Sequence, residues 1–212
     1  MIHIEFYDET FEVAYVPTIR KAYGEAAKLL VGLPDKLTVK FTEDGAEEQS
    51  GVGGFAESPR QLNIAVARNF SDTASQLRNL RAVVFHELFH INQGFTFEQS
   101  PFTALEAAIY EGCAVTFERE YGGGNATYAD FSQHSEDELT SWYRQLENVG
   151  TEYFEDRAVW HKWAFYNPEL NQKWIIYKVG VWLVGKIIEK NTTSTLELQG
   201  KSAHEISQLS IK

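Results

Sequence analysis

Two histidines and a glutamate within five consecutive residues carry the clearest chemical potential of this sequence. They form the run His86-Glu87-Leu88-Phe89-His90, an H-E-x-x-H pattern inside a stretch with helical periodicity. Side chains four residues apart lie one above the other on a helix, so both imidazoles can reach one metal ion. The glutamate between them would lie beside the ion, where its carboxylate can accept a proton. The run therefore predicts a zinc site.

The third ligand that such a site requires has to come from further along the chain. A catalytic zinc ion takes three protein ligands and keeps a fourth position for water. Gly94 is expected to end the first helix one turn after His90, and no His or Cys follows closely. The other solution is a glutamate from the next expected helix, which carries Glu106, Glu111 and Glu118.

Among these three glutamates, Glu111 is the predicted third ligand. Glu106 lies three residues after Thr103, which is the spacing of a capping box and gives Glu106 a structural role. Glu118 lies two turns beyond Glu111 and is expected to hydrogen-bond a ligand histidine. This face would approach the helix that carries His86 and His90 (the metal helix) closely, because most side chains that share it with Glu111 are small. They are Ala104, Ala107, Ala108, Ala114 and Val115.

The composition restricts the class of protein. A chain of 212 residues with 43% hydrophobic and 14% aromatic side chains is expected to form one globular domain, residues 1–212. A net charge of −11 without a basic stripe argues against nucleic acid or an anionic membrane as a partner. The single cysteine, Cys113, excludes an intramolecular disulfide. The absence of a secretory signal and of a long apolar run predicts a cytoplasmic protein.

Hydrophobic periodicity places strands early and helices late, which is typical of an α+β protein. Alternation predicts strands over residues 2–7 and 36–42, followed by an exposed acidic turn over 43–51. Helical spacing predicts helices over residues 17–33, 72–94, 103–121, 135–148, 152–164 and 170–190. The tryptophans at 142, 160, 163, 174 and 182 are interpreted as core of the helical part, and Cys113 as a core residue. Gly180 and Gly185, inside the last helix, are expected to mark close packing points.

Gly53, Gly54 and Phe55 form the candidate substrate-binding stretch. They precede the apolar run 62–67, with which they would form a hairpin. Glycine inside a strand is costly, so it needs a reason such as a bulge or a ligand close to the backbone. An extended substrate added along an edge strand would be such a ligand. A loop before the strand is the alternative interpretation.

A family resemblance joins these motifs. His86–His90 followed by Glu111-Gly112-Cys113-Ala114 resembles the gluzincins, and most closely a group of predicted bacterial Zn-dependent proteases. Tyr177-Lys178-Val179-Gly180 is similar to a late helix of that group. The resemblance implies a zincin-like fold, in which a small twisted sheet with an antiparallel edge strand lies over the active-site helix. A mostly helical lower lobe would follow, with the division between residues 1–94 and 95–212.

The resulting hypothesis is a zinc metallopeptidase that acts on peptide or protein substrates. Zn²⁺ bound by His86, His90 and Glu111 would activate water, with Glu87 as the general base. Tyr177 is the candidate oxyanion donor by resemblance, and His161 and Tyr166 are weaker candidates. The alternative is a non-catalytic zincin-fold protein with a structural or vestigial zinc site. A general base beside an open coordination position favours the enzyme.

Overall fold

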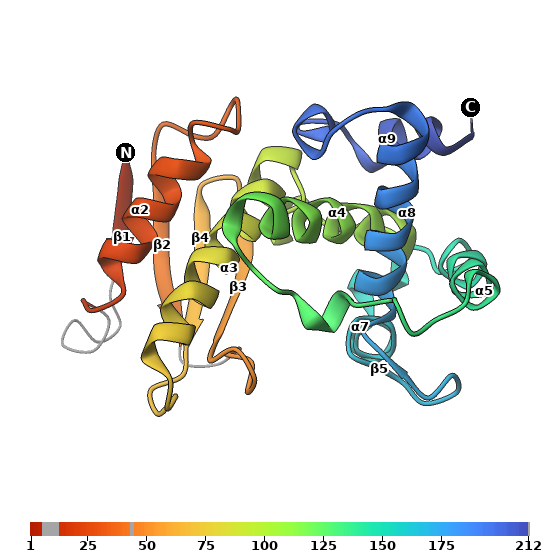
Figure 1. Ribbon diagram of the computed structural model, residues 1–212, viewed down its shortest axis with the longest axis horizontal. Coiled ribbons are helices and arrows are strands. Elements are labelled where there is room, and N and C mark those ends of the chain that lie inside the picture. Colours follow the sequence, from red (N-terminus) through yellow and green to blue (C-terminus); the bar gives the residue numbers. More distant parts are fainter. Residues whose placement is uncertain (6–12, 43–44, 212) are drawn as a thin grey trace. The chain divides into compact units, whose positions relative to one another are not determined.

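The computed structural model describes residues 1–5, 13–42 and 45–211 (Figure 1). Contacts divide the chain into two compact units, which we call the first and the second unit. The first unit consists of Met1–Gln99 and Phe117–Asn125, and the second of Ser100–Thr116 and Ala126–Lys212. A small mixed sheet with a largely helical remainder makes the protein α+β, as the periodicity predicted.

The sheet of the first unit contains four strands: β1 (Ile2–Glu5), β2 (Leu37–Thr42), β3 (Val52–Ser58) and β4 (Gln61–Val66). Their order is β1-β2-β4-β3, with β1, β2 and β4 parallel and β3 antiparallel to β4 at the edge. Parallel neighbours need a crossover, and helix α2 (Val16–Ala26) connects β1 to β2. The β3–β4 hairpin confirms the predicted hairpin and excludes a loop at Gly53-Gly54.

One early element ends sooner than its sequence pattern predicts. Helix α2 stops at Ala26 instead of continuing to residue 33. The amides of Lys28 and Leu29 bond back only three residues, which tightens the last turn and directs Leu30 into the core. The first predicted strand is confirmed over Ile2–Glu5, and its remaining predicted positions, 6 and 7, lie outside the described residues.

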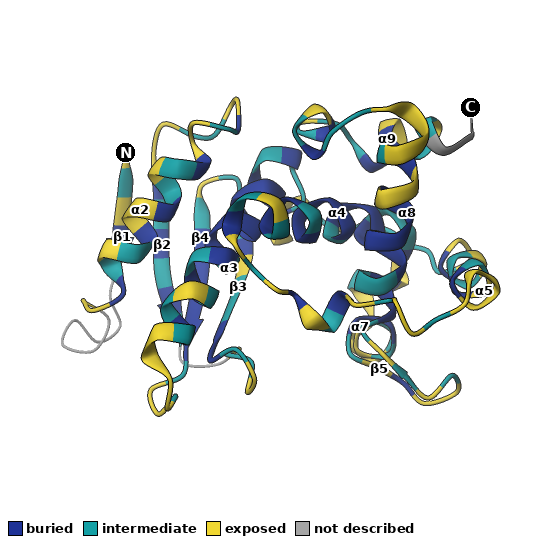
Figure 2. Ribbon diagram, in the orientation of Figure 1, coloured by how far each residue is buried: buried dark blue, intermediate teal, exposed yellow. Residues whose placement is uncertain are grey.

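Helix α3 (Thr73–Gln93) carries the H-E-x-x-H run and has the ends that the sequence predicted. The Asp72 side chain accepts the amide of Ser75 at 2.9 Å, which satisfies a donor at the helix start. Gly94 ends the helix in the left-handed conformation with φ 74°. Every residue from Val84 to Ile91 is buried, so the whole H-E-x-x-H run is shielded from solvent (Figure 2).

Helix α4 (Ala104–Phe117) begins at the predicted capping box and ends differently from the prediction. The amide and hydroxyl of Thr103 donate to the Glu106 carboxylate at 2.8 and 2.9 Å, and the Glu106 amide donates to the Thr103 hydroxyl. The final turn of the predicted helix is not α-helical. It is the π-helix η2 (Glu118–Gly122), closed by Gly123 with φ 75°.

The second unit continues with helices that the sequence located only in part: α5 (Glu136–Leu146), α6 (Glu152–Glu155), α7 (Arg157–Ala164), α8 (Ile175–Asn191) and α9 (Ala203–Ile211). The predicted helix 152–164 is broken at Asp156, whose extended backbone ends α6 while its side chain caps α7. The predicted helix 170–190 begins only at Ile175, because the hairpin of β5 (Tyr166–Asn167) and β6 (Gln172–Lys173) precedes it. Helix α9 was not predicted.

Helices α4 and α8 cross at a pair of glycines. A Cβ atom on Gly112 would lie 2.3 Å from the carbonyl carbon and oxygen of Gly180. A Cβ atom on Gly180 would lie 2.0 Å from the carbonyl oxygen of Ala108. The predicted close approach is therefore confirmed at Gly180, and it is wrong at Gly185, where a Cβ would meet nothing within 4 Å.

The aromatic core of the second unit agrees with most of the interpretation. Trp142, Trp163 and Trp182 are buried, whereas Trp160 and Trp174 are only half-buried. Cys113 is fully buried, as expected for a core residue. Within the described residues, no helix combines the length and apolar character needed to cross a membrane.

Candidate metal centre

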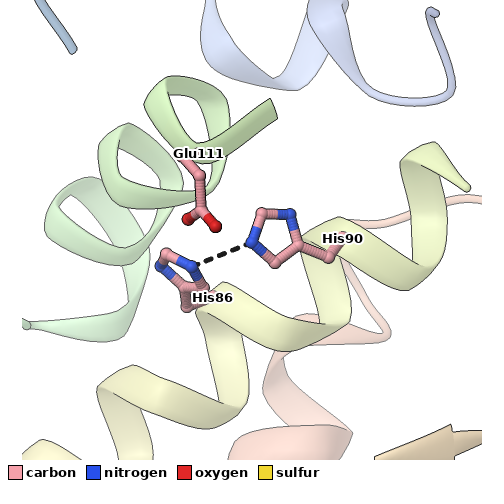
Figure 3. Close-up of side chains that lie close together, drawn as sticks. All are labelled: His86, His90 and Glu111. Atoms are coloured by element: carbon pink, nitrogen blue, oxygen red, sulfur yellow. Dashed lines mark hydrogen bonds between the residues drawn. The ribbon is translucent and has the colours of Figure 1, made fainter. Parts of the chain in front are cut away.

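His86, His90 and Glu111 each offer a ligand atom to one point (Figure 3). These three atoms all lie within 4.8 Å of one another, and the two Nε2 atoms are 2.9 Å apart. Two nitrogens bound to one tetrahedral zinc ion at about 2.1 Å would be about 3.4 Å apart. Two imidazole nitrogens and a carboxylate oxygen are also a donor set that zinc accepts in catalytic sites. The residues therefore fit a zinc ion and are positioned to hold one.

The burial of the histidines sets the chemical environment of this centre. His86 and His90 are 7% and 4% exposed, and Glu111 is half-buried. The first unit packs Phe117 against Phe85 and Phe89 beside the metal helix, with ring centroids 5.6 and 4.8 Å apart. Water is thereby excluded from one side of α3. Buried polar groups in such surroundings need partners, which a metal ion supplies.

Glu118 fixes the orientation of the first histidine. Its Oε2 atom lies 3.2 Å from Nδ1 of His86, and both side chains are buried. An ionised carboxylate only accepts hydrogen bonds, so Nδ1–H of His86 donates and the lone pair remains on Nε2. That nitrogen is the one directed toward Nε2 of His90. The predicted hydrogen bond between Glu118 and one of the two motif histidines is confirmed.

Glu87 lies where the edge strand meets α3. It is only 5% exposed. A Cβ atom on Gly54 would lie 2.6 Å from Cγ1 of Val83 and 3.0 Å from Cγ of Glu87. The glycine in β3 is thus explained by a close approach between strand and helix, at the residue next to His86.

The other two residues of the predicted substrate-binding stretch have different surroundings. A Cβ atom on Gly53 would lie 2.0 Å from the carbonyl oxygen of Gly45, so Gly53 accommodates the preceding loop. Phe55 is 45% exposed, pairs with Asn63 of β4 and lies on the edge strand of the sheet. A large apolar side chain is therefore presented to solvent from that strand.

Tyr177 lies on α8 one turn before the glycine crossing with α4. Its half-buried ring packs on a cluster of Val115, Ala126, Ala129 and Val181. Its ring centroid is 5.0 Å from that of Tyr128 and 5.8 Å from that of Trp174. Val115 follows Glu111 by one helical turn on α4, so Tyr177 packs on the same face of that helix. His161 and Tyr166, the weaker oxyanion candidates, are both exposed.

Two titratable residues near the ligands were not singled out from the sequence. Tyr153 is buried, and burial raises the pKa of its hydroxyl well above the usual value, with the charge of Glu111 adding to that rise. Burial also raises the pKa of Glu47 in the first unit, and the charges of Glu118 and His86 act on it in opposite directions. Glu47 falls in the acidic stretch predicted to be an exposed turn, yet it is half-buried. Glu47 was not singled out because the acidic composition of this stretch indicated a solvated turn.

A comparison with protein families gives a match over most of the chain. The family model covers residues 33–208, which include α3, α4 and all three candidate ligands. No curated protein and no solved structure matches the chain. The description of the matching family is "Predicted Zn-dependent protease (DUF2268)".

Proposed function

The chain belongs to this family of predicted Zn-dependent proteases, and we propose that it is a zinc metallopeptidase of the gluzincin type with a zincin-like fold. The observation that carries the proposal is the convergence of His86, His90 and Glu111 within 4.8 Å. Glu87 lies between the two histidines in sequence and is buried on the same helix. A purely structural metal site has no use for a carboxylate at that position.

The ligand residues would hold Zn²⁺ through two imidazole nitrogens and one carboxylate oxygen. The bound ion would polarise the scissile carbonyl and lower the pKa of water toward about 7. Glu118 maintains the tautomer and ring orientation of His86 through Nδ1. The ligands come from α3 and α4, which are regular helices and therefore hold their side chains more firmly than loops would.

Glu87 would carry the proton during hydrolysis. Its carboxylate would accept a proton from the attacking water and deliver it to the leaving amine. Its burial against β3 limits the rotamers of its side chain and supports this role, since Gly54 leaves room for its Cγ atom. Tyr177 would donate a hydrogen bond to the developing oxyanion. The support for Tyr177 is its position on the Val115 face of α4, one turn beyond Glu111.

The substrate would be a peptide or an extended segment of a protein. Strand β3 is at the edge of the sheet, so its outer backbone groups offer an extended chain a place to pair. Gly53, Gly54 and Phe55 would form this binding edge, with Phe55 contributing apolar contact. The net charge of −11 is unfavourable for nucleic acids, which supports a peptide substrate.

A second candidate function is a non-catalytic protein of the same fold that retains zinc as a structural element. Metal binding alone would support either reading, because a ligand set can persist without catalysis. Glu87 separates the two, since it is not one of the three converging ligands. Its replacement should abolish hydrolysis without removing the ion.

The test compares the wild type with Glu87→Gln and His90→Ala. Zinc content is measured by elemental analysis, and cleavage is measured on a mixed peptide library by mass spectrometry. We expect wild type and Glu87→Gln to bind one zinc ion, and His90→Ala to lose it. His90→Ala should not cleave, and Glu87→Gln should cleave about 10²–10⁴-fold more slowly than the wild type. Equal cleavage by wild type and Glu87→Gln, or no cleavage by a zinc-loaded wild type, would refute the peptidase.

A further inference from the structure

The π-helix η2 and the three glycines at its end hold the carboxylate that contacts His86. Glu118 is the first residue of η2, and the segment turns back immediately at Gly122, Gly123 and Gly124. The amides of Gly123 and Gly124 both donate to the carbonyl oxygen of Glu118, the latter at 3.3 Å. The turn therefore closes over the residue that orients a metal ligand. π-Helices are rare and often occur at functional sites.

The metal helix itself holds this segment from the other side. Arg81 of α3 donates to the carbonyl oxygens of Tyr121, at 2.9 Å, and of Gly122. A guanidinium at the C-terminal end of a helix satisfies carbonyls that lack a helical partner. Gly122 also lies close to α3, since a Cβ atom there would be 3.1 Å from Cβ of Phe85 and 3.3 Å from Cα of Ala82.

Gly124 lies directly against the Glu118 side chain. A Cβ atom at this position would be 2.0 Å from Oε1 and 2.7 Å from both Cδ and Cγ of Glu118. All three nearest atoms belong to a flexible side chain, and none belongs to the backbone. The chain can therefore accommodate a methyl group by rotating the Glu118 side chain about its Cα–Cβ bond, which moves Cγ and the carboxylate together. That movement would remove the contact between Oε2 and Nδ1 of His86, which is 3.2 Å long.

We infer that Gly124 is a positioning residue for the metal site, because its missing side chain lets the Glu118 carboxylate stand against His86. The inference rests on the zinc site of the proposed function and concerns metal affinity, not cleavage. A group that orients a metal-bound histidine typically contributes about 10–100-fold to metal affinity. Gly124 would control that contribution without touching the ion or the histidine.

The test measures the zinc dissociation constant of Gly124→Ala by competition with a chromophoric chelator. We expect zinc affinity to fall by about 10–100-fold, as after loss of the Glu118 contact. The melting temperature of the metal-free variant should stay close to that of the metal-free wild type, because only a side chain has to move. Gly24→Ala is the matched control in the first unit, since a Cβ on Gly24 would meet nothing within 4 Å. Unchanged zinc affinity in Gly124→Ala would overturn the inference.

A double variant shows whether Gly124 acts through Glu118. In the Glu118→Ala background, the Gly124→Ala change should cause no further loss of zinc affinity, because the clashing carboxylate is already gone. Additive losses would overturn the inference. If Gly124→Ala alone fails to fold, the double variant should fold and bind zinc as Glu118→Ala does. An unfolded double variant would mean that alanine meets the backbone, which also contradicts the inference.

The zinc measurement also separates this inference from the proposed function. A wild type that binds zinc and cleaves no peptide would refute the peptidase and leave the role of Gly124 to be decided by the affinities. A wild type that binds no zinc would overturn both.

Discussion

Glycines permit close approach in both units, but what they approach differs. In the second unit, Gly112 and Gly180 face each other's backbone where α4 crosses α8. In the first unit, Gly54 faces the Glu87 side chain and Gly124 faces the Glu118 side chain. A methyl group at the helix crossing would have to move a whole helix. A methyl group at Gly124 would only have to move the Glu118 side chain.

The difference indicates which glycines affect the stability of the fold and which affect the carboxylates at the candidate metal centre. Backbone cannot give way locally, so the glycines of the crossing are expected to determine the free energy of unfolding. Side chains can give way, so Gly54 and Gly124 of the first unit are expected to determine where the carboxylates of Glu87 and Glu118 lie. A substitution should therefore damage folding at one place and function at the other.

Removal of the metal is the largest expected effect. At free zinc about 1,000-fold above its dissociation constant, binding should stabilise the folded protein by about 4 kcal/mol. Chemical denaturation with and without a chelator measures this difference. His90→Ala should show the same unfolding free energy in both conditions, because its ligand set is incomplete. A chelator effect that survives in His90→Ala would place the stabilising ion elsewhere.

The helix crossing should give the next largest effect. Gly180→Ala is expected to lower the unfolding free energy by about 3 kcal/mol, because the new Cβ would overlap the Ala108 carbonyl. Denaturant titration of the metal-free protein measures it. Gly185→Ala on the same helix is the control and should raise stability by up to about 1 kcal/mol, since alanine favours the helix and has room. Equal effects at both positions would mean that the contact between Gly180 and the Ala108 carbonyl does not limit stability.

The start of α4 offers a smaller effect on stability. Thr103→Ala breaks the capping box with Glu106 and should cost about 1 kcal/mol of unfolding free energy. Zinc affinity should change less than twofold, because Glu111 is two turns further along the helix. A large loss of zinc affinity would show that the cap, and not the crossing with α8, positions Glu111.

The last effect is a pH dependence of the second unit, confined to alkaline pH, that should not involve the metal. Burial, and then a hydrogen bond to Glu147, raise the pKa of Tyr143 to about 12. The unfolded hydroxyl titrates near 10, so the folded state binds its proton more tightly, and this stability is complete below pH 10 and lost as the pH rises through about 12. Tyr143→Phe should therefore flatten the fall in unfolding free energy over that range. An unchanged slope in Tyr143→Phe would contradict the raised pKa.

Local signals in the sequence predicted the ends of α3 and the start of α4, the two helices that carry the candidate ligands. Helix α3 begins after Asp72 and ends at Gly94, as expected, and α4 begins at the capping box of Thr103 and Glu106. Each of these features depends on residues within one turn, which a sequence displays directly. The i and i+4 histidines belong to the same class, because helical geometry alone brings them together.

Features that depend on distant partners were missed or only half understood. The second strand of the β5–β6 hairpin, Gln172–Lys173, falls inside the predicted helix 170–190, because strands of two residues are too short to show alternation. The π-helix at Glu118 depends on Arg81 and on the glycines that follow, not on the periodicity of its own residues. Gly54 was rightly singled out as costly, but the sequence did not identify its neighbours as Val83 and Glu87. Tertiary contact decided each of these positions.

Glu111 and Glu118 lie on one continuous helical segment, because α4 continues directly into η2. These carboxylates lie seven residues apart along α4 and the first turn of η2, so their angular separation is set by helix register. Inserting or deleting one residue between them would rotate Glu111 by about 100° relative to Glu118. Length variation within residues 112–117 should therefore be far less tolerated than amino-acid exchange there. The spacing of the two glutamates, more than their surroundings, is the part of this chain that an engineered variant has to keep.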